Sequence, residues 1–175
     1  MKLKDYPLVG CKYIQIDEPL FARKPIEAND YGIEQLERCF HGIENKIEKI
    51  AHICCGYPDR LDAIDYPKAP LRSYFDISKN IDESIIDTVS IEDAHRHNDL
   101  KLLELFKKTN VIFGLVKIAS SKVESVNEID YRIKKALNHI DKKRLIAAPD
   151  CGLGHLKKYM VLEKLRNLVE AAKRN

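Results

Sequence analysis

Short runs of β-branched and other apolar residues alternate five times along the chain with stretches that carry apolar residues at helical spacing. Strands are predicted at 11–19, 49–55, 88–93, 110–118 and 143–152. Helices are predicted at 29–40, 77–87, 98–109, 125–140 and 156–175. This alternation favours an α/β fold with a parallel sheet, because each helical crossover returns the chain to begin the next strand in the same direction.

Right-handed crossovers make such a chain either an open doubly wound sheet or part of a (β/α)8 barrel. About five βα units are too few for a complete barrel, which typically takes about 250 residues, and this chain has 175. The barrel interpretation therefore predicts a partial barrel, residues 1–175, that lacks roughly three units at its amino end. Such a fragment would expose its edge strands and one side of its core, so it would associate, distort or be marginally stable.

Composition excludes several classes of protein. The 30 basic and 27 acidic residues are intermixed and give a formal charge of +3, so no basic surface indicates nucleic-acid binding. No apolar run approaches the roughly 18 residues that span a bilayer, and we expect a cytoplasmic protein with no membrane partner. The 5 cysteines are an odd number, and a reducing compartment argues against a disulfide framework. Metal binding or catalysis is the better explanation for them.

Polar side chains gather at the carboxyl ends of the predicted strands, where both open α/β sheets and barrels bind ligands. They include Asp17, His52, Cys54, Glu92 and Cys151. Strand side chains alternate between faces, so His52 and Cys54 point the same way. The neighbouring Cys55 then points the other way and is predicted to pack in the core.

One imidazole, one carboxylate and two thiolates make a donor set suited to tetrahedral Zn²⁺, and the soft sulfur donors disfavour Mg²⁺ and Ca²⁺. The alternative is that each residue is unrelated to the others, because a cysteine in an apolar strand is often a small buried hydrophobe. A lone strand histidine is likewise often a hydrogen-bonded core residue. The spacing by itself does not establish that the four side chains converge.

The segments YIQIDEPLFA, AHICCG, VSIED and LIAAPDCGLG occur in this order. Together they resemble the catalytic carboxyl-terminal domain of cobalamin-independent methionine synthase, especially its shorter core-type relatives, from about Cys11 to the chain end. The resemblance implies a (β/α)8 barrel of which residues 1–175 form the carboxyl-terminal part. It also implies a substrate amino group bound by Asp17. The zinc ligands that it implies are His52, Cys54, Glu92 and Cys151.

The reaction implied by the resemblance is a zinc-dependent methyl transfer that yields methionine. The methyl group passes from 5-methyltetrahydrofolate, or its polyglutamate form, to the thiol of homocysteine. A free thiol has a pKa of about 8.5, and coordination to a metal deprotonates it. A carboxylate is the hardest of the four ligands against a soft metal, so Glu92 is predicted to be the labile, catalytic ligand.

The chain departs from the family pattern at Ala119, where the family carries a histidine that is thought to protonate the folate leaving group. Alanine cannot donate a proton, so another acid serves, the methyl donor differs, or activity is lost. The alternatives to an enzyme are an inactive or split-gene zinc-binding fragment, acting only with an amino-terminal barrel fragment or by self-association. A third alternative is methyl transfer to another thiol.

Two polar segments near the strand ends also need an interpretation. Residues 93–98 follow the third predicted strand and form either a solvated loop or the mouth of a substrate site. Asp150 is expected to accept hydrogen bonds from nearby backbone rather than to take part in catalysis.

Overall fold

The computed structural model describes residues 3–43 and 45–175 of the chain. Its centre is one sheet of five parallel strands. The strands are β1 (Tyr13–Glu18), β2 (Glu48–Ile53), β3 (Thr88–Ile91), β4 (Asn110–Val116) and β5 (Leu145–Pro149). Each lies within a segment predicted as a strand, apart from the first residue of β2, and the α/β fold class is confirmed.

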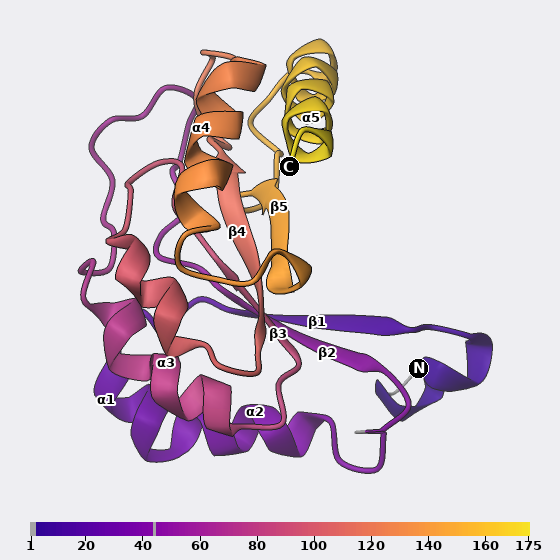
Figure 1. The fold of residues 1–175 in the computed structure, drawn as a ribbon. Coiled ribbons are helices and arrows are strands. Elements are labelled where there is room, and N and C mark those ends of the chain that lie inside the picture. The colour runs from indigo at the N-terminus through magenta and orange to yellow at the C-terminus, as the bar shows by residue number, and fades with distance from the viewer. Residues whose placement is uncertain (1–2, 44) are drawn as a thin grey trace.

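The order of the strands distinguishes between the two predicted architectures. The strands lie in the sheet in the order in which they occur in the chain, whereas a doubly wound sheet reverses its order at a switch point. With right-handed crossovers, a constant order places the connecting helices on one face of the sheet. Figure 1 shows that the sheet is strongly twisted: β1 and β2 run roughly horizontally in the view, whereas β4 and β5 run roughly vertically. The fold is a partial (β/α)8 barrel.

The helices pack against one face of this sheet. They are α1 (Pro25–Glu27), α2 (Ile33–Cys39), α3 (Ser73–Glu83), α4 (Val126–Ala136) and α5 (Lys158–Lys173), with a π-helical turn (Ala28–Gly32) joining α1 to α2. Short 3₁₀ turns lie at Leu3–Asp5, Pro7–Val9 and Lys142–Arg144. Helix α4 begins with a capping box, because the Ser125 hydroxyl accepts from the Glu128 N–H and the Glu128 carboxylate accepts from the Ser125 N–H.

The prediction of an α-helix at 98–109 is wrong. The structure forms a 3₁₀ helix at Leu100–Leu105 instead, and Asp99 caps it by accepting from the Lys101 N–H at 3.0 Å. Leu103 and Phe106 are buried. With Leu100 they recur at intervals of three residues, and this spacing suits the three residues per turn of a 3₁₀ helix.

The two faces of the sheet differ in what covers them. The helix-facing side is apolar and fully buried, and its residues include Ala51, Ile53, Val89, Ile91, Val111 and Phe113. On the opposite side the strand register aligns one row of residues, namely Asp17, His52, Ser90, Ile112 and Ile146. We call this side the inner face. Ile146 is 43% exposed there, and among the described strands none pairs with the outer edge of β1 or β5.

Residues 54–72 connect β2 to α3 in a long segment without helix or strand. Tyr74, at the start of α3, donates from its hydroxyl to the carbonyl of Ile53 at 2.8 Å and accepts from the N–H of Glu92 at 3.0 Å. The carboxyl ends of β2 and β3 are thereby held in register. None of the helices in the described ranges combines the length and the apolar character that crossing a bilayer requires.

Candidate metal centre

Three predicted ligands come together at the carboxyl end of the sheet. His52 lies near the end of β2, Cys54 follows that strand, and Cys151 follows β5. One ligand atom from each residue lies within 4.8 Å of the ligand atoms of the other two. Residues nearly one hundred positions apart in the chain therefore form one group, which is compatible with a metal site of imidazole and thiolate donors.

The orientation of His52 fits metal binding. The ring is 4% exposed, and its Nδ1 lies 2.9 Å from the Ser90 hydroxyl on the adjacent strand. The other ring nitrogen, Nε2, is buried and has no hydrogen-bond partner among the described residues. A buried nitrogen without a partner is costly. A metal ion accepts this lone pair, and a hydrogen bond at the opposite ring nitrogen is the usual support for a metal-ligating histidine.

The ionisation of the two thiols is coupled. The hydrogen bond with Cys151, together with burial, raises the pKa of Cys54 well above its ordinary value. The same hydrogen bond from Cys54 lowers the pKa of Cys151. Burial lowers the pKa of His52, but Cys54 and the charges of Asp17 and Glu92 outweigh it and raise that pKa. His52, Cys54 and Cys151 would hold a zinc ion, which would supply the positive charge that offsets the two thiolates.

Glu92 lies beside this group but its carboxylate contacts other residues. One oxygen accepts from the Cys55 N–H at 2.7 Å, and the other lies 2.7 Å from the ammonium of Lys68. Glu92 is therefore not among the three residues that the geometry brings within ligand distance of one another. Its role as a fourth ligand remains a prediction. Cys55 is buried in the core, as the alternation of strand side chains predicted.

Asp17 opens onto the inner face. Its carboxylate accepts from the Gln15 side-chain amide at 2.7 Å. A hollow of about 450 Å³ on this face is lined by Asp17, His52 and Cys151, together with apolar side chains of β4 and β5. The position is compatible with binding a substrate amino group next to the metal site, and this role of Asp17 remains a prediction.

Asp150 organises the loop after β3. It is 1% exposed, and its carboxylate accepts from the backbone N–H groups of Asp93, Ala94 and His95, each at 2.8 Å. The expectation that Asp150 hydrogen-bonds backbone is confirmed. Gly114 is required beside it, because a Cβ at that position would lie 2.0 Å from Asp150 Oδ1.

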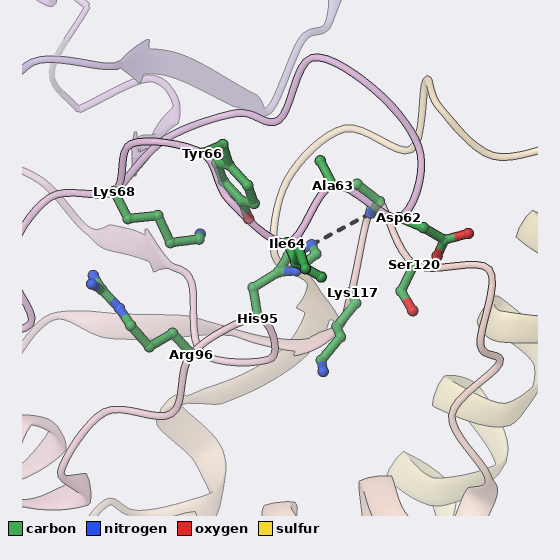
Figure 2. A pocket seen from close by; sticks show the side chains of 10 residues that line it. Asp62, Ala63, Ile64, Tyr66, Lys68, His95, Arg96, Lys117 and Ser120 are labelled. Carbon is green, nitrogen blue, oxygen red and sulfur yellow. Dashed lines mark hydrogen bonds between the residues drawn. The ribbon is translucent and has the colours of Figure 1, made fainter.

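A second cavity of about 520 Å³ lies beneath the connection between β2 and α3 (Figure 2). Lys68 and Arg96 line it, as does Ala119. His95 also lines it, and its Nε2 accepts from the Ile118 N–H at 3.1 Å. Burial and the nearby cations Lys68 and Lys117 lower the pKa of His95 to about 4, so the ring is neutral near pH 7. Residues 93–98 thus contribute to a cavity wall.

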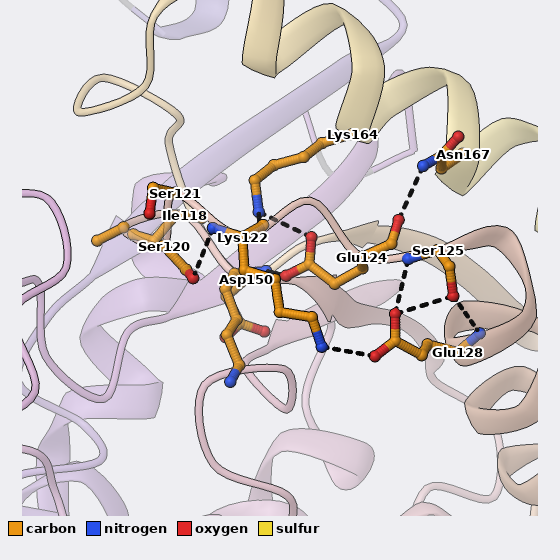
Figure 3. Close-up of polar contacts among 12 residues, drawn as sticks. Ile118, Ser120, Ser121, Lys122, Glu124, Ser125, Glu128, Asp150, Lys164 and Asn167 are labelled. Carbon is orange, nitrogen blue, oxygen red and sulfur yellow. Dashed lines mark hydrogen bonds and ion pairs between the residues drawn. The ribbon is translucent and has the colours of Figure 1, made fainter.

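The loop that carries Ala119 is fixed from behind by α5 (Figure 3). The ammonium of Lys164 is completely buried and contacts the Glu124 carboxylate at 2.7 Å and the Lys122 carbonyl at 2.6 Å. Glu124 also accepts from the Lys117 N–H at 3.0 Å. These contacts hold the loop that forms one wall of the second cavity. The loop therefore does not depend on a polar side chain at position 119 for its conformation.

Sequence reasoning missed Lys68. This residue lies in the segment between β2 and α3, where no hydrophobic periodicity indicates which way a side chain points. Lys68 reaches Glu92 only because the segment between β2 and α3 passes over the ends of the strands, and the sequence does not indicate this path. Its only sequence signal is a lysine in a long connection, which predicts a solvated side chain.

Together, a parallel sheet of barrel type and a His–Cys–Cys group at its carboxyl end define a partial-barrel α/β protein with a candidate thiolate metal centre. The sequence model of the family described as "Cobalamin-independent synthase, Catalytic domain" matches residues 2–174. The chain belongs to this family, as its motifs indicated.

Several known proteins are similar to the chain. A methionine synthase of Pyrococcus abyssi is 28% identical over 98% of this chain and 46% of that protein. A 5-methyltetrahydropteroyltriglutamate–homocysteine methyltransferase of Campylobacter jejuni is 32% identical over 97% of this chain and 22% of that protein. The chain thus spans less than half the length of these relatives.

A solved structure shows the same fold. The B12-independent methionine synthase from Shewanella sp. W3-18-1, in complex with selenomethionine, superposes with a TM-score of 0.86 at 31% identity. The match covers 98% of this chain and 50% of that protein. The whole of the described sheet therefore corresponds to part of a larger relative.

Proposed function

We propose that this chain forms the zinc-binding part of a methyltransferase that converts homocysteine to methionine. The proposed methyl donor is 5-methyltetrahydrofolate, in the polyglutamate form named for one relative. The observation that carries the proposal is the buried Nε2 of His52, which lacks a hydrogen-bond partner among the described residues, in a group with the thiols of Cys54 and Cys151. Family membership and the names of the relatives support the reaction.

His52, Cys54 and Cys151 would hold the metal, with Glu92 as the fourth ligand. When bound, zinc supplies the Lewis acidity that keeps a substrate thiol ionised near neutral pH. Three anionic ligands leave the site near a charge of −1, so a coordinated sulfur keeps its electron density and its nucleophilicity. Glu92 would be the most readily displaced of these ligands, because a carboxylate is the hardest donor of the set.

The inner face would bind the amino acid. Asp17 offers a carboxylate for the ammonium group of homocysteine, and the hollow there also presents Ile112 and Ile146 to its methylene groups. In the transfer, the substrate sulfur forms the new S–CH₃ bond while the N–CH₃ bond of the donor breaks. The electron pair of that bond stays on the donor nitrogen, which takes up a proton. Ala119 cannot supply this proton, so it comes from another group or from solvent.

Zinc content and turnover test the proposal together. The purified chain should contain about one zinc per molecule by elemental analysis, and His52→Ala and Cys151→Ser should lower this stoichiometry at least tenfold. Cys39→Ser is the matched control, since Cys39 is exposed and its thiol donates only to the Gln35 carbonyl. Methionine formation is followed by mass spectrometry. A parent chain without zinc contradicts the proposal.

A second candidate is a zinc-binding fragment that acts only when another chain segment covers its inner face. The observation that favours it is the open sheet, with Tyr13 of β1 61% exposed and Ile146 of β5 43% exposed. Light scattering gives the oligomeric state of the zinc-loaded chain, and the same sample is assayed for methionine. A monomer that binds zinc without turnover supports this candidate, whereas turnover by the monomer contradicts it.

A further inference from the structure

Lys68 and Glu92 form an ion pair at the boundary between the metal centre and the second cavity. Their charged atoms lie 2.7 Å apart, and the two side chains are 13% and 7% exposed. Glu92 follows β3 directly, whereas Lys68 comes from the connection between β2 and α3. The pair therefore joins two segments that meet only in the folded chain.

The backbone and the carboxylate of Glu92 are held by different partners. The Glu92 N–H is fixed by the buried hydroxyl of Tyr74, so the backbone is held in place. The carboxylate lies next to the Cys54 end of the metal centre, because one of its oxygens accepts from the N–H of Cys55, the residue after Cys54, at 2.7 Å. A rotation of the side chain would then exchange the contact with Lys68 for one with the metal centre.

The two partners differ in what they can contact when the pair separates. Lys68 lines the 520 Å³ cavity, and its ammonium lies 4.9 Å from the centre of the Tyr66 ring (Figure 2). The cation can be solvated there and stabilised by the ring. Glu92 is almost fully buried, and a buried carboxylate without a counter-charge is strongly disfavoured. Glu92 therefore needs Lys68 whenever it is not bound to a metal.

We propose that Lys68 is a positioning residue that accepts the Glu92 carboxylate when a substrate thiol displaces it from the metal. This inference rests on the proposed function. Lys68 lowers the free energy of the displaced state and so favours thiol binding, without itself touching the substrate. Removal of the ammonium takes away the cation that contacts the displaced carboxylate, and the thiol then competes against a more tightly held ligand.

The test uses the 175-residue chain loaded with Co²⁺, whose visible spectrum reports the donor atoms directly. L-Homocysteine is titrated into the parent, Lys68→Met, Lys68→Gln and Lys68→Arg, and Co²⁺ affinity is measured separately by competition with a chelator. Lys117→Met is the matched control, because Lys117 lines the same cavity without contacting Glu92. We expect Lys68→Met and Lys68→Gln to bind homocysteine at least tenfold more weakly than the parent. Their affinity for Co²⁺ should equal or exceed that of the parent. The arginine variant should restore much of the affinity.

A double-mutant cycle shows whether Lys68 acts through Glu92. In a Glu92→Gln background the Lys68→Met change should have little further effect on homocysteine affinity. Equal homocysteine affinity in the parent and both neutral variants overturns the inference, and so does a parallel loss of Co²⁺ and homocysteine binding. If homocysteine leaves the spectrum of the parent unchanged, the proposed function itself fails and takes this inference with it. The two failures are therefore distinguishable.

Discussion

Nδ1 of His52 and the hydroxyl of Ser90 lie 2.9 Å apart on adjacent strands, and this contact leaves Nε2 as the ring nitrogen available to the group formed with Cys54 and Cys151. The two residues are register partners, so the hydrogen bond is a direct consequence of the pairing of β2 with β3. It also selects the ring orientation, because only one nitrogen can face the hydroxyl.

Replacing this hydroxyl should weaken the metal centre without unfolding the chain. We expect Ser90→Ala to lower zinc affinity about tenfold, the lower end of the range for partners that orient a metal-ligating histidine. Competition with a chromophoric chelator measures the affinity. Ser78→Ala is the control, because that buried hydroxyl donates only to the Phe75 carbonyl in α3. Equal zinc affinity in Ser90→Ala and the parent would show that the hydroxyl does not orient the ring.

The close contact between Gly114 and Asp150 predicts that adding one methyl group at position 114 strongly lowers the free energy of unfolding. In Gly114→Ala the new Cβ would lie 2.0 Å from Asp150 Oδ1 and 2.9 Å from its Cα, so the carboxylate must leave the three N–H groups that it accepts from. We expect the free energy of unfolding to fall by about 3 kcal/mol in urea denaturation. Gly152→Ala should change it far less, because nothing lies within 4 Å of a Cβ there. Similar values for both variants would contradict this account.

His95 gives the stability a defined dependence on pH. Its folded pKa of about 4 lies below its ordinary value of 6.5, so folding favours the neutral ring. This contribution is complete above pH 6.5 and is lost as the pH falls from 6.5 through 4. Complete burial would make it about 3 kcal/mol, and partial exposure reduces it to roughly 1–2 kcal/mol. Burial raises the pKa of Asp150 to about 6, which acts in the opposite direction over this window, so the His95 contribution is read as the difference between the parent and His95→Gln. Urea denaturation at several pH values should show the stability of the parent falling relative to His95→Gln as the pH falls from 6.5 to 4. A constant difference between the two proteins would contradict the prediction.

Lys164 should be essential to the loop that carries Ala119. Lys164→Met leaves the Glu124 carboxylate, which is 13% exposed, without its ammonium partner. Breaking a buried pair on one side costs about 3–5 kcal/mol, and we expect a corresponding drop in the free energy of unfolding. The double variant Lys164→Met/Glu124→Gln should recover part of this loss, because no unpaired charge remains. If the double variant is less stable than Lys164→Met, the unpaired Glu124 carboxylate is not the cause of the lost stability.

The sequence determined the local features of this protein. The five alternations predicted the strands, because a short apolar, β-branched run between helical stretches indicates a buried strand within a single segment. The helix predicted at 125–140 is α4, and the capping box at its start is a local feature because it needs only two residues three positions apart, Ser125 and Glu128. The local pattern is misleading at Leu100–Leu105, where a spacing of three residues predicts an α-helix and the structure has a 3₁₀ helix.

Only the tertiary structure decided which distant residues meet. Cys54 and Cys151 come together because β2 and β5 end at the same edge of a sheet whose order never reverses. The partnership of Lys68 with Glu92 arises from the path of a long connection over the strand ends. Periodicity reports each segment's own burial, whereas convergence depends on strand order, register and twist, which are set by packing across the whole sheet.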